Sequence, residues 1–453
     1  ALNALLGTQF DILGEGRFWG VAIALALHLY PIIYLNATAA IANLDPSLDE
    51  AAETLGASAW RRFWRVTLPL IRPGLFAGGA VVFIWSFTEL GTPLVFDYYD
   101  VTSVQIFNGI KEMSASAQPY ALTAVMLVLA VVFYLLGKGV FGRSGHAASL
   151  RATRAGDVKK LSPVQGALAS GAFALVTFLA VLPHIGVALM AFSEPGSWYA
   201  TVLPSEWTVA NIESALGHPL AFNSITNSLQ LAIAAMLLDI AFGLAIGYVI
   251  VRTKVRGRSI LDGLSMMPLA VPGLVMAFGF VAMSLQWPFG EGSTFLGIPS
   301  PLAGAIDIVG ENPNPFPLLI IAYAVRRLPY IVRATVAGLE QVTPDLEQAA
   351  YNLGAGTLTN LRRIVIPLIM ANLLAGGLLA FSFAMLEVSD SLILAQQERH
   401  WPITKAILGF TERLGDGPNI ACGMGMWAML LLTATLVGAS ALLGKKLGSL
   451  FRV

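Results

Sequence analysis

"LDPSLDEAAETLGASAWRRFWRVTLPL" (44–70, cassette one) and "VTPDLEQAAYNLGAGTLTNLRRIVIPL" (342–368, cassette two) are charged, amphipathic stretches in a largely apolar chain. A constant shift of 298 residues places cassette one on cassette two, and this register holds from about residue 29 to 96. The recurring residues include Pro31 and Pro329, Pro46 and Pro344, Gly56 and Gly354, Pro69 and Pro367, and Glu89 and Glu387. Unrelated apolar helices would share leucine and valine, but not proline, glycine and glutamate at one shift. The chain therefore contains an internal duplication.

Each cassette has the signals of a short helix, a tight turn and a second helix. Asp45 can cap a helix, and Pro46 suits the first helical position because no amide hydrogen is needed there. Gly56 predicts a left-handed cap at the end of this helix, and Ser58 can cap the second helix. In cassette two, Thr343 corresponds to the N-terminal cap, Pro344 to the first helical residue and Gly354 to the left-handed cap. We therefore expect short helices over 45–56 and 343–354.

The composition is that of a membrane protein. Hydrophobic residues make up 56% of the chain and charged residues 12%, against about 25% charged in a soluble domain. The net charge of zero gives no indication of a nucleic-acid partner, and the single Cys422 excludes an internal disulfide. We predict an all-α polytopic membrane protein with about nine spans. The spans are expected near 17–41, 72–96, 118–140, 165–192, 224–251, 260–285, 316–340, 370–394 and 419–442.

Positive charges predict the orientation. If both cassettes face the cytoplasm, 22 of the 27 lysines and arginines lie on that side, with Arg326 and Arg327 counted there. The domains expected are three spans over 1–141, a basic cytoplasmic linker over 142–164, and a six-span half over 165–453. The repeat then predicts that the first half lacks its first three spans, as in a fragment of a twelve-span chain. A natural arrangement of three plus six spans is the alternative.

The first helix of each cassette has an apolar stripe at helical spacing. The stripe consists of Leu48, Ala51, Ala52 and Leu55 in cassette one, and of Leu346, Ala349, Ala350 and Leu353 in cassette two. Such a stripe suits a helix seated in a groove of a partner protein. Alternatively, it packs on the protein's own spans or lies at the lipid surface.

The cassettes resemble the EAA signature of ABC importer permeases, of the type I fold. The matching residues are Glu50, Ala51, Ala52, Gly56, Val66, Leu68 and Pro69, and in the second copy Ala349, Ala350, Gly354, Ile364 and Pro367. The second copy departs from the signature at Gln348 and Ile366, and Glu347 is a candidate replacement for the missing acid. The stretches "MMPLAVPGLVMAFGF" and "EVSDSLILA" are most similar to fused, two-in-one permeases of the iron(III) type. Relatives of that type carry thiamine, polyamines or phosphonates, which remain alternative cargoes.

The resemblance implies a permease of the bacterial inner membrane, served by a periplasmic binding protein and by two copies of a cytoplasmic ATPase. The ATPase-coupling residues it implies are Glu50, Ala51, Ala52, Leu55, Gly56, Pro69, Glu347, Gln348, Ala349, Ala350, Leu353, Gly354 and Pro367. The sequence itself contains no G-x-x-x-x-G-K-[ST] loop. We therefore expect no enzymatic activity and no cofactor in this chain, with ATP and Mg²⁺ bound by the partner ATPase.

Acidic residues within spans are candidates for a transport path, because each costs about 2.5–3.5 kcal/mol at the bilayer centre. These candidates are Glu89, Glu387, Asp390 and Asp239. An oxygen-rich site formed by them would attract a hard cation such as Fe³⁺. Alternatively, the acids cap helices or pair with Arg399 or Lys405. The five scattered histidines predict no fixed metal site.

Two prolines and one glycine predict a break in one span. Pro268, Pro272 and Gly273 lie within the stretch 260–285, and such breaks occur both at gates and as plain packing kinks.

Two other classes of protein compete with the importer. An ion-coupled secondary transporter also uses repeats and broken helices, but has no reason to carry two capped docking helices. A membrane scaffold that transports nothing is the third class. Co-purification of an ATPase discriminates the three.

Overall fold

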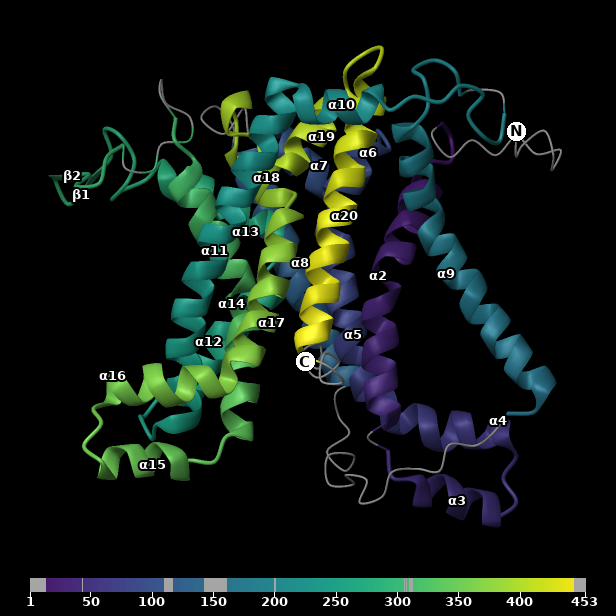
Figure 1. Cartoon of the computed structure of the whole chain (residues 1–453), viewed down its shortest axis with the longest axis vertical. Coiled ribbons are helices and arrows are strands. Elements are labelled where there is room, and N and C mark those ends of the chain that lie inside the picture. The colour runs from purple at the N-terminus through teal and green to yellow at the C-terminus, as the bar shows by residue number, and fades with distance from the viewer. Residues whose placement is uncertain are drawn as a thin grey trace. The chain divides into compact units, whose positions relative to one another are not determined.

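The computed structural model is almost entirely helical (Figure 1). It describes residues 14–42, 44–109, 117–141, 161–198, 201–304, 306, 308 and 313–443. Six helical stretches in this part are long and apolar enough to cross a membrane: Arg17–Ala42, Ala59–Thr88, Pro163–Ala191, Pro219–Arg252, Thr357–Met385 and Gly417–Gly438. The bent pair α12 and α13 makes a seventh if it is counted as one span. The prediction of an all-α polytopic membrane protein is confirmed.

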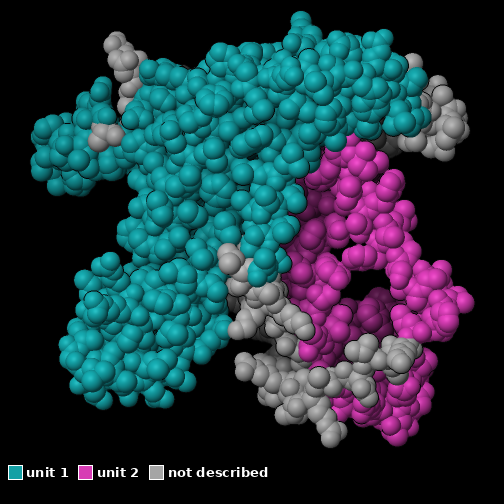
Figure 2. Space-filling view, in the orientation of Figure 1, with its two compact units in different colours: residues 1–9, 103–119, 187–450 teal, residues 10–102, 120–186, 451–453 magenta. Residues whose placement is uncertain are grey.

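The helices belong to two compact units (Figure 2). The first, labelled unit 2 and magenta in Figure 2, comprises residues 10–102, 120–186 and 451–453. The second, labelled unit 1 and teal in Figure 2, comprises 1–9, 103–119 and 187–450. The described elements of the first are α2 (Arg17–Ala42), α3 (Pro46–Thr54), α4 (Ala59–Arg62), η1 (Phe63–Thr67), α5 (Leu68–Thr88), α6 (Gly91–Val95), α8 (Gln118–Phe141) and most of α9 (Pro163–Ala191). The linker expected over 142–164 lies outside the described residues up to 160.

The second unit contains the remaining elements. They are α7 (Thr102–Gly109), α10 (Ala210–Gly217), α11 (Pro219–Arg252), α12 (Arg258–Ala270), α13 (Gly273–Ser284), β1 (Thr294–Phe295), β2 (Ile298–Pro299), α14 (Phe316–Gln341), α15 (Asp345–Asn352), α16 (Thr357–Asn360), η4 (Leu361–Val365), α17 (Ile366–Met385), α18 (Ser389–Leu394), η5 (Glu398–His400), α19 (Ile403–Thr411) and α20 (Gly417–Leu443). The two strands form a small antiparallel hairpin with Thr294 opposite Pro299.

Close helix packing in the second unit depends on small residues. An added Cβ at Gly243 of α11 would lie 2.5 Å from the Cγ2 of Ile331, and one at Gly247 would lie 2.6 Å from the Cγ2 of Thr335. Gly376 of α17 brings that helix equally close to Ala334. Small residues of this kind let membrane helices approach closely. They hold α11, α14 and α17 together as the core of this unit.

Three of the nine expected spans are interrupted. Helix α5 ends at Thr88 and α6 follows it after Leu90, while α17 ends at Met385 and α18 follows it after Val388. The stretch 260–285 is broken at Val271 and Pro272, where α12 and α13 meet at 101°. The predicted proline break is confirmed at Pro272, whereas Pro268 lies inside α12. The other two breaks follow no proline and were missed.

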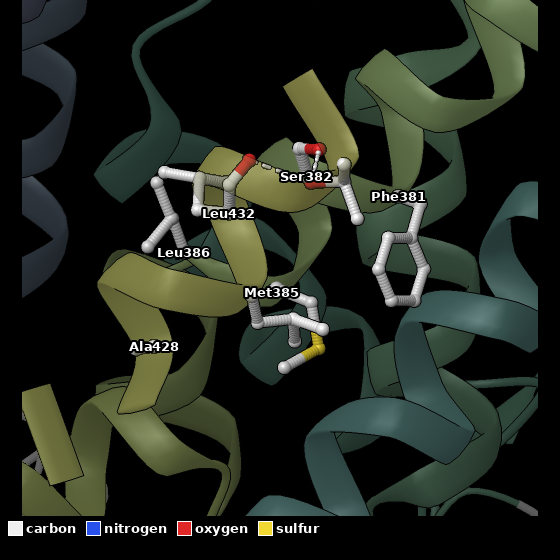
Figure 3. A pocket seen from close by; sticks show the side chains of 8 residues that line it. Phe381, Ser382, Met385, Leu386, Ala428 and Leu432 are labelled. Carbon is white, nitrogen blue, oxygen red and sulfur yellow. Dashed lines mark hydrogen bonds between the residues drawn. The ribbon is translucent and has the colours of Figure 1, made fainter. Parts of the chain in front are cut away.

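An apolar pocket lies between α17 and α20 (Figure 3). A hydrogen bond of 2.7 Å joins the hydroxyls of Ser382 and Thr435 at its wall. The residues that line it carry no charge, so the pocket has no group able to hold an ionic cargo.

Candidate functional site

The first helix of cassette one, α3, begins as its sequence predicts. The carboxylate of Asp45 accepts a hydrogen bond of 3.0 Å from the amide of Ser47, which lowers the pKa of that carboxyl. Pro46 is the first helical residue. The second helix, α4, begins at Ala59, and the amide of Arg61 donates to the hydroxyl of Ser58 at 3.4 Å. Both predicted caps of cassette one are confirmed.

Cassette two begins its helix differently. Helix α15 begins at Asp345, with Pro344 in the capping position and no side-chain hydrogen bond to the cap. The prediction that Thr343 caps this helix is wrong, because the residue that directly precedes the helix is Pro344. Gly356 precedes α16 and likewise brings no side chain.

The turn after the first helix is the same in both copies. Gly56 has φ +80° and Gly354 has φ +84°, the left-handed region that favours glycine. The amide three residues past each helix donates a hydrogen bond of 3.0 Å back into that helix, from Ala57 to the carbonyl of Ala52 and from Ala355 to the carbonyl of Ala350. The predicted glycine caps are confirmed.

Each cassette then enters the next long helix through a π-helical turn. The turns are η1 and η4, at the same positions of the repeat, and each stands directly before α5 or α17. Pro69 and Pro367 follow as the second residue of these helices. Proline has no amide hydrogen and its ring crowds the carbonyl four residues back, so a wider turn relieves the clash. The π turns were not predicted; the in-register prolines were the available signal.

The apolar stripe does not pack fully on the protein's own helices. Leu55 is 87% exposed and Leu353 is 89% exposed, and both stand at the tight turn. Five residues further along the chain, Trp60 and its counterpart Leu358 are 72% and 78% exposed. Of the stripe's alanines, Ala350 is buried. Each cassette therefore presents an exposed apolar tip, formed by Leu55 and Trp60 in one copy and by Leu353 and Leu358 in the other.

Each cassette contains an acidic residue of its first helix that forms an ion pair with an arginine. In cassette one, Arg62 pairs with Asp49 at 3.0 Å and with Glu53 at 3.3 Å. In cassette two, the buried Glu347 pairs at 2.6 Å with Arg252, the last residue of α11. Asn360, the counterpart of Arg62, donates only a long bond of 3.5 Å to Glu347. The basic partner therefore comes from within cassette one but from a spanning helix in cassette two.

This arrangement corrects the expectation that Glu347 replaces an acid at Gln348. Glu347 is buried beside Arg252, whereas Gln348 is exposed. The counterpart of Gln348 is Glu50, which is exposed as well. Glu347 therefore corresponds to Asp49, in both register and orientation, and the exposed position of cassette two carries no acid.

A buried charge network lies where α13, α14 and α18 meet. Glu387 accepts a hydrogen bond of 2.6 Å from Arg326 and is also paired with Arg327. Asp390 accepts a bond of 3.3 Å from the same Arg326. The Arg326 guanidinium also packs on Gly273, at the start of α13, so that a side chain on that glycine would collide with it. The expected acids are therefore matched by two arginines.

The network corrects two sequence expectations. Glu387 and Asp390 pair with Arg326 and Arg327, whereas Arg399, one of the expected partners, donates to the backbone carbonyl of Pro313. Arg326 and Arg327 lie within α14 rather than at its end, so they do not count toward the orientation. Removing them still leaves the positive charges strongly biased to the cassettes' side. The signal for the network was the pair of arginines inside the apolar run "IIAYAVRRLPYIV".

The other two candidate path residues occupy different environments. Glu89 accepts hydrogen bonds from the amides of Gly91 and Thr92, at 3.1 and 3.3 Å, and so caps the start of α6. Asp239 is buried within α11 and is 1% exposed. Glu89 thus follows the helix-capping alternative, while Glu387 follows the ion-pair alternative with different partners.

Comparison with known proteins identifies the family. A model described as "Binding-protein-dependent transport system inner membrane component" matches residues 2–144 and 239–443. The chain is 28% identical over 437 residues to the ferric transport system permease protein FbpB of Actinobacillus pleuropneumoniae, covering 93% of this chain and 59% of the relative. It is 24% identical to the Fe(3+)-transport system permease protein FbpB 2 of Haemophilus influenzae, covering 84% of this chain and 68% of that protein.

Among solved structures, the chain resembles a crystal structure of a bacterial ABC transporter involved in the import of the acidic polysaccharide alginate. The TM-score is 0.46 at 16% identity, covering 63% of this chain and 98% of that one. The chain spans about three fifths of the length of the Actinobacillus relative. With more than half of its residues matched by the family model, the chain belongs to the binding-protein-dependent transport system inner membrane components.

Proposed function

We propose that the chain is the permease of an ATP-driven importer, in which each cassette receives one cytoplasmic ATPase. The observation that carries the proposal is the exposed apolar tip, repeated in both cassettes on the same rigid turn. An exposed leucine on a short, capped helix suits a groove in a partner protein. The positive charges that accompany the cassettes support a cytoplasmic location for both of them.

The cargo proposed is ferric iron, delivered by a periplasmic binding protein. The names of the two relatives support this cargo. The buried acids do not add support, because Arg326 and Arg327 neutralise Glu387 and Asp390. Iron-loaded binding protein should therefore stimulate ATP hydrolysis through contacts outside this network.

The test replaces the two exposed tips. The double variant Leu55→Asp with Leu353→Asp puts a charge where each side chain contacts little of its own chain, so the permease should fold normally. We expect the ATPase that co-purifies from native membranes to fall at least about tenfold, since about 1.4 kcal/mol of lost docking energy is a factor of ten.

The matched control is Leu414→Asp, at a leucine that is 98% exposed in the turn between α19 and α20. It should retain the ATPase at the wild-type level. Full retention by the double variant, or loss in the control as well, would contradict docking at the cassettes. If the wild type retains no ATPase, the secondary-transporter class becomes the better explanation.

A further inference from the structure

Arg252 joins three elements of the second unit. It is the last residue of α11, and its Nε donates to the carboxylate of Glu347 in α15 at 2.6 Å. Its Nη2 donates to the carbonyl of Leu339 at 2.9 Å and to that of Val342 at 2.8 Å, at the end of α14. The guanidinium thus contacts both long helices and the short helix of cassette two.

The environment suits a fixed cation. The last carbonyls of a helix lack partners within the helix and carry partial negative charge, so a guanidinium at this point satisfies α14. Glu347 supplies a full negative charge beside it. Because Arg252 and Glu347 are both largely withdrawn from water, with side chains 11% and 6% exposed, their pairing is screened little by salt.

Helix α15 has few other inward contacts. Of its eight described residues, only Glu347 and Ala350 are buried. The helix is flanked by the left-handed turn at Gly354 and by the extended residue Val342. Two side chains link the helix to α11: Tyr351 interacts with Tyr248, and Glu347 forms the ion pair with Arg252. Of these two links, only the ion pair is charged and also reaches the end of α14.

The long helices meet at a packed cluster next to this pair. Leu339 of α14 is buried with Val365, Ile369 and Leu373, and Val251 of α11 packs against them. A close-packed cluster of this kind transmits a displacement as a body rather than absorbing it. A movement of α15 that reaches Arg252 would therefore be passed to α11 and α14 together.

We propose that Arg252 is a positioning residue, which makes α15 move as one body with α11 and α14 when an ATPase closes on cassette two. This inference rests on the proposed function, because it takes an ATPase as the source of the movement. Substitution of Arg252 is expected to leave docking itself intact, since its side chain is largely buried whereas Leu353 and Leu358 of the tip are exposed.

The experiment measures the distance between α15 and the turn that directly follows α11, within the purified complex. Spin labels are placed at Asn352 and Lys254, which are both exposed, in a Cys422→Ser background that removes the only cysteine. Distances are recorded in nanodiscs with the co-purified ATPase, without nucleotide and after trapping with ATP and vanadate. In the parent protein the distance should stay the same in both states.

Arg252→Gln should let the distance shift on trapping by more than the width of the parent distribution, and should lower stimulated hydrolysis about tenfold. Arg252→Lys keeps the charge but not the planar guanidinium with its several donors. Its distance shift and its hydrolysis rate should lie between those of the parent and of Arg252→Gln, and it serves as a second variant in case Arg252→Gln does not fold. Arg258→Gln is the matched control, because this exposed arginine of the same turn donates only to the carbonyl of Thr253.

Unchanged distances in both Arg252 variants, with the ATPase still bound, would overturn the inference and leave the proposed function standing. A parent complex that retains no ATPase would overturn the proposed function, and this inference with it.

Discussion

The two cassettes share a backbone but differ in what holds them. Both have a glycine in the left-handed region, an amide that donates back to a carbonyl of the preceding helix, and a π turn, all at equivalent positions. In cassette one, however, Arg62 closes an ion pair inside the cassette, while in cassette two Arg252 closes it from a spanning helix. Local sequence therefore determines the shape of each cassette. The position of the arginine, within the cassette or on a spanning helix, determines how firmly the cassette is attached to the long helices.

The same contrast recurs at the far ends of the long helices. Glu89 and Glu387 occupy one position of the repeat, yet the first caps a short helix and the second is enclosed by two arginines. At the shift of 298 residues, the counterparts of Arg326 and Arg327 are His28 and Leu29. The repeat has therefore kept the acid and changed its partner.

The largest difference in stability is expected between substitutions of Glu387 and of Glu89. Glu387→Ala leaves two buried or half-buried guanidinium groups without their main acid, and removal of one partner from a buried pair costs about 3–5 kcal/mol. Glu89→Ala removes the acceptor of a helix cap, and loss of such a cap costs about 0.5–2 kcal/mol. The free energy of unfolding, from reversible denaturation in mixed micelles, should separate the two variants clearly. Equal losses would show that the arginines do not distinguish the copies.

A smaller effect is expected from the acids of the cassettes. Glu347→Ala leaves Arg252 with its two carbonyl partners but no counter-charge, which should cost about 2–3 kcal/mol. Asp49→Ala removes a half-exposed acid, and an exposed pair of this kind contributes about 0–1 kcal/mol. The same denaturation assay compares them. A loss at Asp49 as large as that at Glu347 would mean that both cassettes are anchored alike.

The glycine turns of the two cassettes should respond equally to substitution by alanine, unlike the acids above. Gly56→Ala and Gly354→Ala each force an L-residue into the left-handed region, at about 1–2 kcal/mol. An added Cβ meets nothing within 4 Å at either position, so no steric term distinguishes the copies. Local amide exchange in α3 and α15 should rise by similar factors. A large difference would reveal a contact that one turn makes and the other lacks.

Local features were predictable from the sequence because their cause is local. The caps at Asp45 and Ser58 and the glycine turns depend on residues within five positions of one another. The repeat itself followed from proline and glycine spacing. The interruption at Pro272 was equally visible, since proline removes an amide donor from the helix.

The partners of the buried charges were not predictable in the same way. Arg326 and Glu387 are 61 residues apart, and Arg252 and Glu347 are 95 apart. Which of several arginines meets an acid is determined by how the long helices pack, and that packing rests on the small residues of α11 and α17. Helical spacing alone located the acids but could not choose among their partners.

The smallest expected effect concerns the start of the second helix in each cassette. Ser58 has φ −65° and ψ 156°, and its counterpart Gly356 has φ −73° and ψ 162°, so the two backbones are nearly the same. Gly356→Ser should therefore place a hydroxyl where it accepts the amide of Thr359, as Ser58 accepts that of Arg61. No atom lies within 4 Å of the added Cβ.

The gain over glycine should be a few tenths of a kcal/mol, and Ser58→Gly should lose a similar amount. Amide exchange at Thr359 should slow by about twofold in the first variant, and that at Arg61 should quicken by about twofold in the second. Opposite changes of similar size would show that the two backbones are interchangeable at this point. Exchange that stays unchanged at Thr359 would mean that the π turn, and not the cap, sets the stability of this helix start.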